Sequence, residues 1–250
     1  MKVALLSDIH ANIQAFDACL EHARSQSAQQ YAILGDLVGY GADPVAVVRR
    51  VQTLVEEGAW VVKGNHDDMA VSPPLEVSSV GDSTAAWTHA QLESEQLDFL
   101  DKLPLTLEKS MLLLVHASAN EPELWRYVVD ERSAGASLDS AAKWPDVRYV
   151  FGGHVHEQML YYRGAGAKLM RFLPTPGVAV PMPKHRHWLA TIGSVGQPRD
   201  GNSQAMYALF DTAKSRLTFH RVAYDHDAAA VAIRQAGLPN YFADRLELGR

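Results

Sequence analysis

Five short apolar runs in the first 156 residues are each followed by aspartate, asparagine or histidine. The runs alternate with amphipathic stretches, a pattern that is typical of βα units. Just past the ends of the runs lie Asp8 with His10, Asp36, Asn65 with His66, His116, and His154 with His156. In an open α/β sheet the carboxyl ends of the strands form the edge at which sites assemble. The pattern therefore predicts an α/β fold with one site built from distant segments.

The same apolar pattern predicts the individual elements. We expect buried strands at residues 1–6, 31–34, 60–62, 111–115 and 149–151. We expect helices over about 13–25, 44–57, 83–93 and 94–102, while residues 122–143 should be helical or irregular. After His156, short runs between glycine and proline turns predict antiparallel strands at 160–162, 168–172, 188–192, 205–210 and 216–222, with a final helix over about 227–236.

The chain contains no Ser/Gly-rich linker, charge block or internal repeat, so we expect residues 1–250 to form a single domain. A more polar stretch with Pro73-Pro74 and two predicted helices interrupts the strands, which predicts a helical cap insertion at about 70–105. A chain of this size buries enough surface to fold without a disulfide. The single cysteine, Cys19, excludes both an internal disulfide and a thiolate metal cluster.

Charge and hydropathy limit the possible partners. Acidic residues (29) outnumber basic ones (23), and the net charge of −6 provides no electrostatic footprint for a nucleic-acid polymer. The apolar start at residues 1–6 is too short for a signal peptide, and no run approaches the ~20 apolar residues of a membrane span. We therefore expect a cytoplasmic protein with no membrane contact and no obligate protein partner.

The spacing of the polar residues favours metal binding. Asp8 and His10 are two residues apart, as are His154 and His156, and in extended backbone this spacing points both side chains the same way. Each residue alone has an ordinary explanation, such as a helix cap, a turn or a satisfied core histidine. Repetition at five strand ends is harder to explain in this way. Glycines that permit close backbone approach precede three of the groups, namely Gly35, Gly64 and the pair Gly152-Gly153.

These residues resemble, in order, the five motifs of the calcineurin-like metallophosphoesterases. The matching segments are Asp8-Ile9-His10, Gly35-Asp36-Leu37-Val38-Gly39-Tyr40, Gly64-Asn65-His66-Asp67, His116, and Gly153-His154-Val155-His156. The chain also resembles a bacterial and archaeal subgroup of phosphodiesterases that includes relatives hydrolysing dinucleoside polyphosphates. The resemblance implies a four-layer αββα sandwich of two mixed β-sheets flanked by helices, with the later strands supplying the second sheet.

The resemblance also implies a dinuclear site. Asp8, His10 and His156 would hold one metal ion; Asn65, His116 and His154 would hold the other; Asp36 would bridge them. A carboxylate can span two cations through its two oxygens, whereas asparagine and histidine each satisfy one. The ligand set lacks thiolates and suits two divalent ions of Mn, Fe, Co, Ni or Zn, with Mn or Fe favoured.

The implied activity is hydrolysis of phosphodiester, nucleotide or dinucleoside polyphosphate bonds in a small phosphorylated metabolite by a metal-bound hydroxide. His66 would protonate the leaving oxygen, although a turn histidine at a helix start is the plain alternative. A phosphomonoesterase or protein phosphatase, and a non-catalytic scaffold, remain alternative functions. Protein phosphatases of the superfamily carry Asp and Arg where this chain has Gly39 and Tyr40. Asp67 or Asp68 could orient His66 instead, or the role of His66 could be smaller than the resemblance implies.

Two further residues are candidates for substrate binding. Arg199 lies in the Gly-rich segment 193–201, which is similar to a loop of the same subgroup, and it could pair with a second phosphate. The alternative is a hairpin loop with a surface arginine. Tyr40 could stack on a base or simply pack beside the site.

Overall fold

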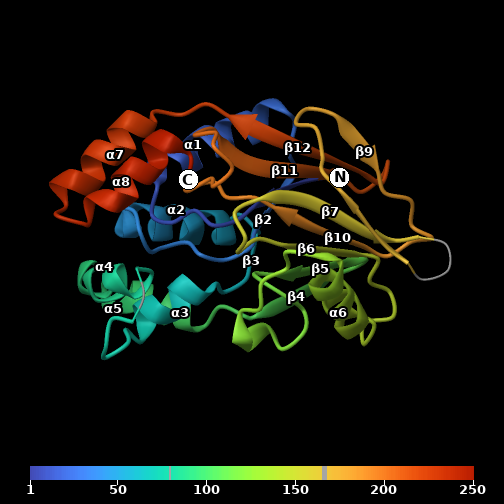
Figure 1. The fold of residues 1–250 in the computed structure, drawn as a ribbon, viewed down its shortest axis with the longest axis horizontal. Helices are drawn as coiled ribbons and strands as arrows, with labels where there is room; N and C mark the ends of the chain where they lie inside the picture. Colours follow the sequence, from blue (N-terminus) through green and yellow to red (C-terminus); the bar gives the residue numbers. More distant parts are fainter. Residues whose placement is uncertain (79, 165–167) are drawn as a thin grey trace.

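Two six-stranded mixed sheets form the centre of the protein (Figure 1). The structure is a computed structural model and describes residues 1–78, 80–164 and 168–250. The first sheet has the order β3 (Trp60–Val61), β2 (Gln30–Ile33), β1 (Lys2–Leu6), β11 (Ala205–Asp211), β12 (Arg216–Val222) and β9 (Ala179–Pro181). The second has the order β4 (Thr106–Lys109), β5 (Leu112–Val115), β6 (Tyr149–Gly152), β10 (Trp188–Ile192), β7 (Gln158–Arg163) and β8 (Leu169–Phe172).

The two sheets pack face to face through a shared apolar core. Along β1 the side chains alternate, so that Val3 and Leu5 enter the core between the sheets while Ala4 and Leu6 face the helices on the other side. In the core between the sheets the ring of Phe210 lies 4.7 Å from that of Tyr149, measured between ring centroids. Contacts of this kind join β11 of the first sheet to β6 of the second.

Helices cover both outer faces. On the first sheet, α1 (Ile13–Ser25) and α2 (Pro44–Glu56) bury an apolar stripe that includes Phe16 and Val47. On the second sheet, α6 (Glu131–Ala141) buries Ala134 and Leu138. Asn12 caps α1 by accepting a hydrogen bond from the amide of Ala15. The four layers confirm the predicted αββα sandwich.

The segment between β3 and β4 contains α3 (Asn65–Val71), the 3-10 turn η1 (Asp82–Thr84), α4 (Ala85–Gln91) and α5 (Ser94–Asp101). The last two helices correspond to those expected within 70–105, whereas α3 was not expected, and residue 79 lies outside the described residues. Leu92 and Leu100 of this segment join the same apolar cluster as α1 and α2. The single domain over 1–250 and the cap at 70–105 stay predictions.

The later strands do not supply the second sheet alone, so that prediction was wrong. β7, β8 and β10 lie in the second sheet, whereas β9, β11 and β12 extend the first. The physical reason is burial: β10 is buried along its whole length and β11 along nearly all of it, so each needs neighbours on both edges. β11 finds them in β1 and β12, and β10 in β6 and β7.

The carboxyl end of the chain forms two helices instead of the one expected. α7 (His226–Gln235) agrees with the predicted helix over 227–236, and α8 (Asn240–Leu248) follows it. Pro239 stands before the first turn of α8 and Gly249 ends it in the left-handed conformation, so the sequence carried both signals of a further helix. The short strands β4 and β9 were also not expected. Among the described residues there is no helix long and apolar enough to cross a membrane.

Candidate metal centre

The seven predicted ligands lie together at one edge of the sandwich. They occupy the segments that follow β1, β2 and β3 of the first sheet and β5 and β6 of the second. Backbone hydrogen bonds tie these segments to one another, from the Asp8 amide to the Gly35 carbonyl (3.0 Å) and from the Gly153 amide to the His116 carbonyl (2.7 Å). Six of the seven side chains are buried, and Asn65 is half-buried. The predicted site edge is therefore shared by both sheets.

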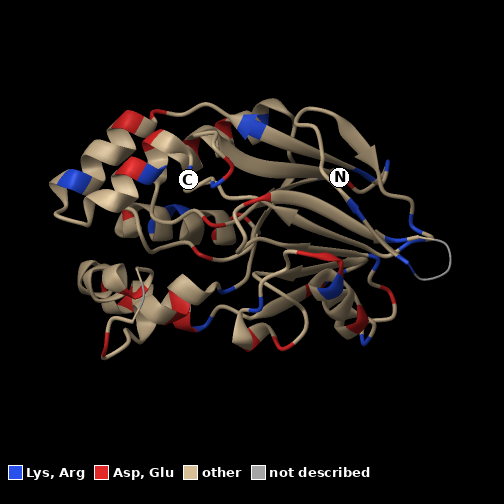
Figure 2. Ribbon diagram, viewed as in Figure 1, with Lys and Arg blue, Asp and Glu red and all other residues tan. Residues whose placement is uncertain are grey.

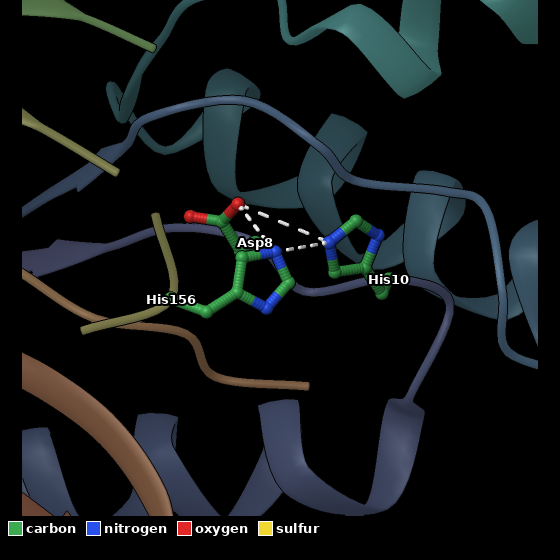
Figure 3. A group of neighbouring side chains, drawn as sticks. All are labelled: Asp8, His10 and His156. Atoms are coloured by element: carbon green, nitrogen blue, oxygen red, sulfur yellow. Dashed lines mark hydrogen bonds and ion pairs between the residues drawn. The ribbon is translucent and has the colours of Figure 1, made fainter. Parts of the chain in front are cut away.

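The first group consists of Asp8, His10 and His156 (Figure 3). His156 Nε2 lies 3.2 Å from Asp8 Oδ1, and His10 Nε2 lies 3.8 Å from the same oxygen. The two imidazole Nε2 atoms are 3.1 Å apart. One ligand atom from each residue thus points into a common small volume, as a metal site requires.

The second group consists of Asp36, His116 and His154, with Asn65 beside it. His116 Nε2 lies 3.2 Å from His154 Nδ1, 3.2 Å from Asn65 Oδ1 and 3.4 Å from Asp36 Oδ2. This set offers two nitrogens and two oxygens and no sulfur. Such a set suits borderline divalent ions.

Asp36 stands between the two groups. Its Oδ2 lies 3.7 Å from His10 Nε2 in the first group and 3.4 Å from His116 Nε2 in the second. Its Oδ1 accepts a hydrogen bond from the His66 amide at 2.8 Å, which fixes the orientation of the carboxylate. Oδ2 alone therefore faces both groups, whereas from the sequence we expected one oxygen to serve each.

Hydrogen bonds on the outer side of three imidazoles fix their orientation. The Nδ1 atoms of His10, His116 and His156 contact the backbone carbonyls of Val38 (3.2 Å), Leu34 (2.7 Å) and Gln197 (2.6 Å). A carbonyl only accepts, so each Nδ1 must donate, and in the neutral ring Nε2 is left with a lone pair that faces the centre. The lone pairs of His10 and His156 face each other across 3.1 Å and repel, so a proton or a cation is needed between these two nitrogens.

In the pKa values of the site, burial competes with the attraction between opposite charges. Burial opposes the charged form of His116, yet the negative charge and hydrogen bond of Asp36 raise the pKa of His116 to about 9. Burial would raise the pKa of Asp36, but the attraction of His116 and His66 holds it well below its usual value. Burial holds the pKa of His10 low in spite of Asp36. A metal ion entering the site must therefore displace the His116 proton.

The backbone is strained at five of the seven predicted ligands. Asp8, His10, Asp36, His154 and His156 have φ values of 53°, 49°, 52°, 67° and 58°. For residues other than glycine this left-handed conformation costs about 1 kcal/mol each, and such strain clusters at functional sites. Hydrogen bonds hold the strained segments, for example from the His154 amide to Asp8 Oδ2 at 2.9 Å.

Two of the glycines are required by close packing. A Cβ atom at Gly64 would overlap the carboxylate and the amide of Asp36. A Cβ at Gly153 would overlap the Asp8 carboxylate and the hydroxyl of Ser7. The glycines noted in the sequence therefore allow the loop after β3 to pack against Asp36 and the loop after β6 to pack against Asp8.

His66 lies beside both groups. Its ring centroid is 5.0 Å from that of His10, and one of its nitrogens lies in a cluster with ligand atoms of His10 and Asp36. Burial lowers the pKa of His66, so the neutral ring predominates at neutral pH. Gly39 makes room for this ring, because a Cβ there would lie 2.7 Å from His66 Nδ1.

The two carboxylates considered as partners of His66 have other contacts. Asp67 Oδ1 accepts from the Leu37 amide at 2.8 Å and the Val38 amide at 3.3 Å, and Oδ2 accepts from the Gly64 amide at 2.9 Å. Burial raises the pKa of Asp67 to about 7. Asp68 is more than half exposed and pairs with Lys63 at 3.4 Å. Asp67 therefore connects two site loops through their backbone.

Tyr40 and Arg199 lie on the side of the first group. The Tyr40 ring is 4.4 Å from that of His10, 4.3 Å from that of His66, and stacks at 4.9 Å on Phe242 of α8. Burial raises the pKa of Tyr40 to about 12, so its hydroxyl stays protonated. Arg199 Cζ lies 5.8 Å from the Tyr40 ring centroid. The ring of Tyr40 is thus packed on several sides.

Sequence reasoning missed the contribution of α8, which brings Phe242 against Tyr40. Aromatic residues of the segment 125–127 lie on the side of the second group. There the ring of Tyr127 stacks 4.1 Å from that of His154 and is more than half exposed. The ring of Trp125 lies 5.9 Å from that of His116. An exposed aromatic face thus borders the predicted metal ligands.

Comparison with known proteins gives consistent matches over the whole chain. A family model described as the calcineurin-like phosphoesterase superfamily domain matches residues 1–215. The uncharacterized protein MJ0912 of Methanocaldococcus jannaschii is 31% identical over 254 residues, covering 99% of this chain and 98% of that protein. The crystal structure of a metallophosphoesterase from Sphaerobacter thermophilus is 32% identical with a TM-score of 0.87, covering 100% and 99% of the two chains. The hypothetical protein PH1004 from Pyrococcus horikoshii, at 19% identity, shares the fold with a TM-score of 0.80 over 100% and 98% of the chains.

Proposed function

Because the chain belongs to the calcineurin-like phosphoesterase superfamily, we propose that it hydrolyses small phosphodiesters, nucleotides or dinucleoside polyphosphates with two divalent metal ions. Membership of the family indicates a hydrolase that acts on phosphate esters and depends on metal. The metallophosphoesterase from Sphaerobacter thermophilus, similar over the full length, supports the metal requirement. The substrate class and the roles of individual residues are our proposal.

The observation that carries the proposal is the position of Asp36. One carboxylate oxygen faces histidine nitrogens of both groups at 3.7 and 3.4 Å, while the other is held by a backbone amide. We assign Asp8, His10 and His156 to one ion, Asn65, His116 and His154 to the other, and Asp36 to both. When bound, two such ions supply a nucleophile from water at neutral pH and neutralise charge on the phosphoryl oxygens.

The chain's own residues supply the remaining requirements. Hydrolysis forms a bond from a water oxygen to phosphorus and breaks the bond to the leaving oxygen, which must gain a proton. We assign this proton to His66, the ionisable side chain that lies beside both groups without belonging to the predicted ligand set. Its lowered pKa makes the protonated form a stronger acid, although a less populated one at neutral pH.

The surroundings of the site favour a small substrate. On one side Tyr127 offers an exposed aromatic surface against His154, which suits a nucleobase or another planar leaving group. On the other side Tyr40 and Arg199 provide a hydroxyl and a positive charge. Gly39 and Tyr40 replace the Asp and Arg of protein phosphatases, which argues against a phosphoprotein substrate.

Metal-reconstituted protein provides the direct test. Elemental analysis should find two ions per chain, and the loaded protein should hydrolyse bis-p-nitrophenyl phosphate faster than p-nitrophenyl phosphate and leave a phosphopeptide intact. Preference for p-nitrophenyl phosphate or the phosphopeptide would replace the proposal with a monoesterase or a protein phosphatase. Failure to turn over any phosphate ester, tested with Mn, Fe, Co, Ni and Zn, would leave the scaffold alternative.

A further inference from the structure

Two arginines from distant parts of the chain come together beside Tyr40. Arg199 lies in the segment 193–201, and Arg245 lies on α8. Arg199 Nη2 donates to Gln197 Oε1 at 2.9 Å, and Arg245 Nη1 lies 3.5 Å from the same oxygen. Both arginine residues are half-buried. Among the described residues, the side-chain acceptor that the two arginines have in common is thus a neutral amide, which cannot offset two positive charges.

The carboxylates closest in sequence are engaged by other arginines. Asp200 pairs with Arg221, while Asp244 and Glu247 pair with Arg234 at 3.0 and 2.7 Å. Acidic and basic residues are both present along α7 and α8 (Figure 2). Within residues 1–78, 80–164 and 168–250, no carboxylate forms a salt bridge with Arg199 or with Arg245.

Two further observations indicate an anion as the missing partner. Arg199 Nε is buried and has no hydrogen-bond partner among the described residues. Burial, followed by repulsion from Arg199, lowers the pKa of Arg245. Two adjacent guanidinium groups without a counter-ion are costly to bury in part, and in a chain of net charge −6 acidic residues are not scarce. The arrangement therefore favours binding of an anion over structural support.

The position of the pair suits a substrate that also reaches the metal centre. The Tyr40 ring centroid lies 4.4 Å from that of His10 and 5.8 Å from Arg199 Cζ. Arg199 thus lies over the tyrosine that packs against His10 of the first group, and Arg245 reaches the same place through Gln197. A small molecule held at the predicted metal ligands needs only one more charged group to contact them.

We propose that Arg199 and Arg245 bind a second phosphoryl group of the substrate, next to the one that is hydrolysed. The inference rests on the proposed function and narrows the substrate class to compounds with two or more phosphoryl groups, such as nucleoside polyphosphates. Planar guanidinium forks match phosphoryl oxygens in pairs of hydrogen bonds, and a neutral Tyr40 hydroxyl adds a donor. Arg245 is the new element of this site.

Binding of inorganic pyrophosphate to the metal-free protein tests the arginine pair without any turnover. Calorimetry should give a Kd about 10-fold higher for Arg245→Gln, and about 10-fold higher for Arg199→Gln, than for the wild type. Arg186→Gln is the matched control. Arg186 lies over the Tyr162 ring at 5.2 Å, as Arg245 lies over the Tyr241 ring at 4.9 Å. Arg186 precedes β10, however, whereas the segment 193–201 follows the other end of that strand. The Kd of Arg186→Gln should equal that of the wild type.

Unchanged pyrophosphate affinity in both arginine variants, or equal weakening by Arg186→Gln, would overturn the inference. Thermal melting shows whether each variant is folded, and Arg199→Gln decides the matter if the change in α8 unfolds the protein.

Turnover by the metal-loaded protein separates this inference from the function on which it rests. Arg245→Gln should lower the ratio of kcat/KM for a nucleoside diphosphate to that for the matching monophosphate by about 10-fold. If the wild type hydrolyses phosphate esters and Arg245→Gln leaves this kcat/KM ratio unchanged, the arginine site alone is overturned. A wild type without any hydrolysis overturns the proposed function, and pyrophosphate binding then still decides whether the arginine site exists.

Discussion

Replacement of Asp36 by asparagine should remove both metal ions. The change keeps the shape of the side chain but removes the charge that faces His10 Nε2 at 3.7 Å and His116 Nε2 at 3.4 Å. A unit charge about 4 Å from another is worth about 4 kcal/mol at an effective dielectric constant near 20. Losing it should weaken metal binding by about a thousandfold, because each 1.4 kcal/mol is a factor of ten.

The metal-free protein gives an independent signature of the same substitution. In the wild type Asp36 raises the pKa of His116 to about 9, against about 6.5 in the unfolded chain. This contribution, about 3 kcal/mol, is fully present below pH 6.5 and is lost as the pH rises through 9. Asp36→Asn should flatten the fall in unfolding free energy between pH 6.5 and 9.

Elemental analysis, calorimetry and urea unfolding at several pH values provide the measurements. Asp17→Asn is the control, because Asp17 is a partly exposed carboxylate paired with Arg50 and its loss should leave metal content unchanged. Asp36→Asn protein that retains two ions and a normal rate would refute the assignment of Asp36 as the shared ligand.

Three further outcomes follow from the site. His66→Ala should retain both ions and lower turnover of alkyl phosphates by about 100-fold, but lower that of p-nitrophenyl esters much less; equal losses would contradict the acid role. Metal binding should release protons, and its affinity should rise as the pH approaches the pKa of His116 near 9. Calorimetry in buffers of different ionisation enthalpy measures the protons released. Metal affinity that does not depend on pH would argue against displacement of the His116 proton. Gly153→Ala should abolish metal binding, since the added Cβ would overlap Asp8. Gly135→Ala is the control: this helical position has open space around it, so metal binding should persist and the free energy of unfolding should rise by about 0.5–1 kcal/mol. Intact metal binding in Gly153→Ala would show that the loops can separate.

Residues that follow buried strands were the part of the site most readily predicted. Asp8, Asp36 and His116 stand within two residues of the end of an apolar run. This local signal does not depend on which sheet the strand joins. The distribution of strands between the two sheets was predicted wrongly, because it depends on pairings across most of the chain, such as Ala4 with Leu209. A local pattern shows that β11 is buried but not which strand it pairs with.

The arginine pair shows a second limit of local patterns. Arg199 drew attention because of the glycines around it, whereas Arg245 lies in an ordinary amphipathic helix whose sequence shows no functional feature. Its relevance comes from the return of α8 to the site, where Phe242 stacks on Tyr40 at 4.9 Å. Pro239 and Gly249 are local signals for this helix, which was not expected, but neither residue shows where the helix packs.

The replacement at residue 40 and the arginine pair are best understood together. Protein phosphatases of the superfamily have an arginine at the position of Tyr40, so the tyrosine by itself removes a positive charge that would bind phosphate. Here Arg199 lies over the same tyrosine at 5.8 Å, and Arg245 contacts the Gln197 side chain that Arg199 also contacts. In the arrangement that we propose, two positive charges, those of Arg199 and Arg245, replace the single charge and lie beyond the Tyr40 ring. A site of this form binds a phosphoryl group beyond the reacting one, so it selects for the length of the phosphate chain.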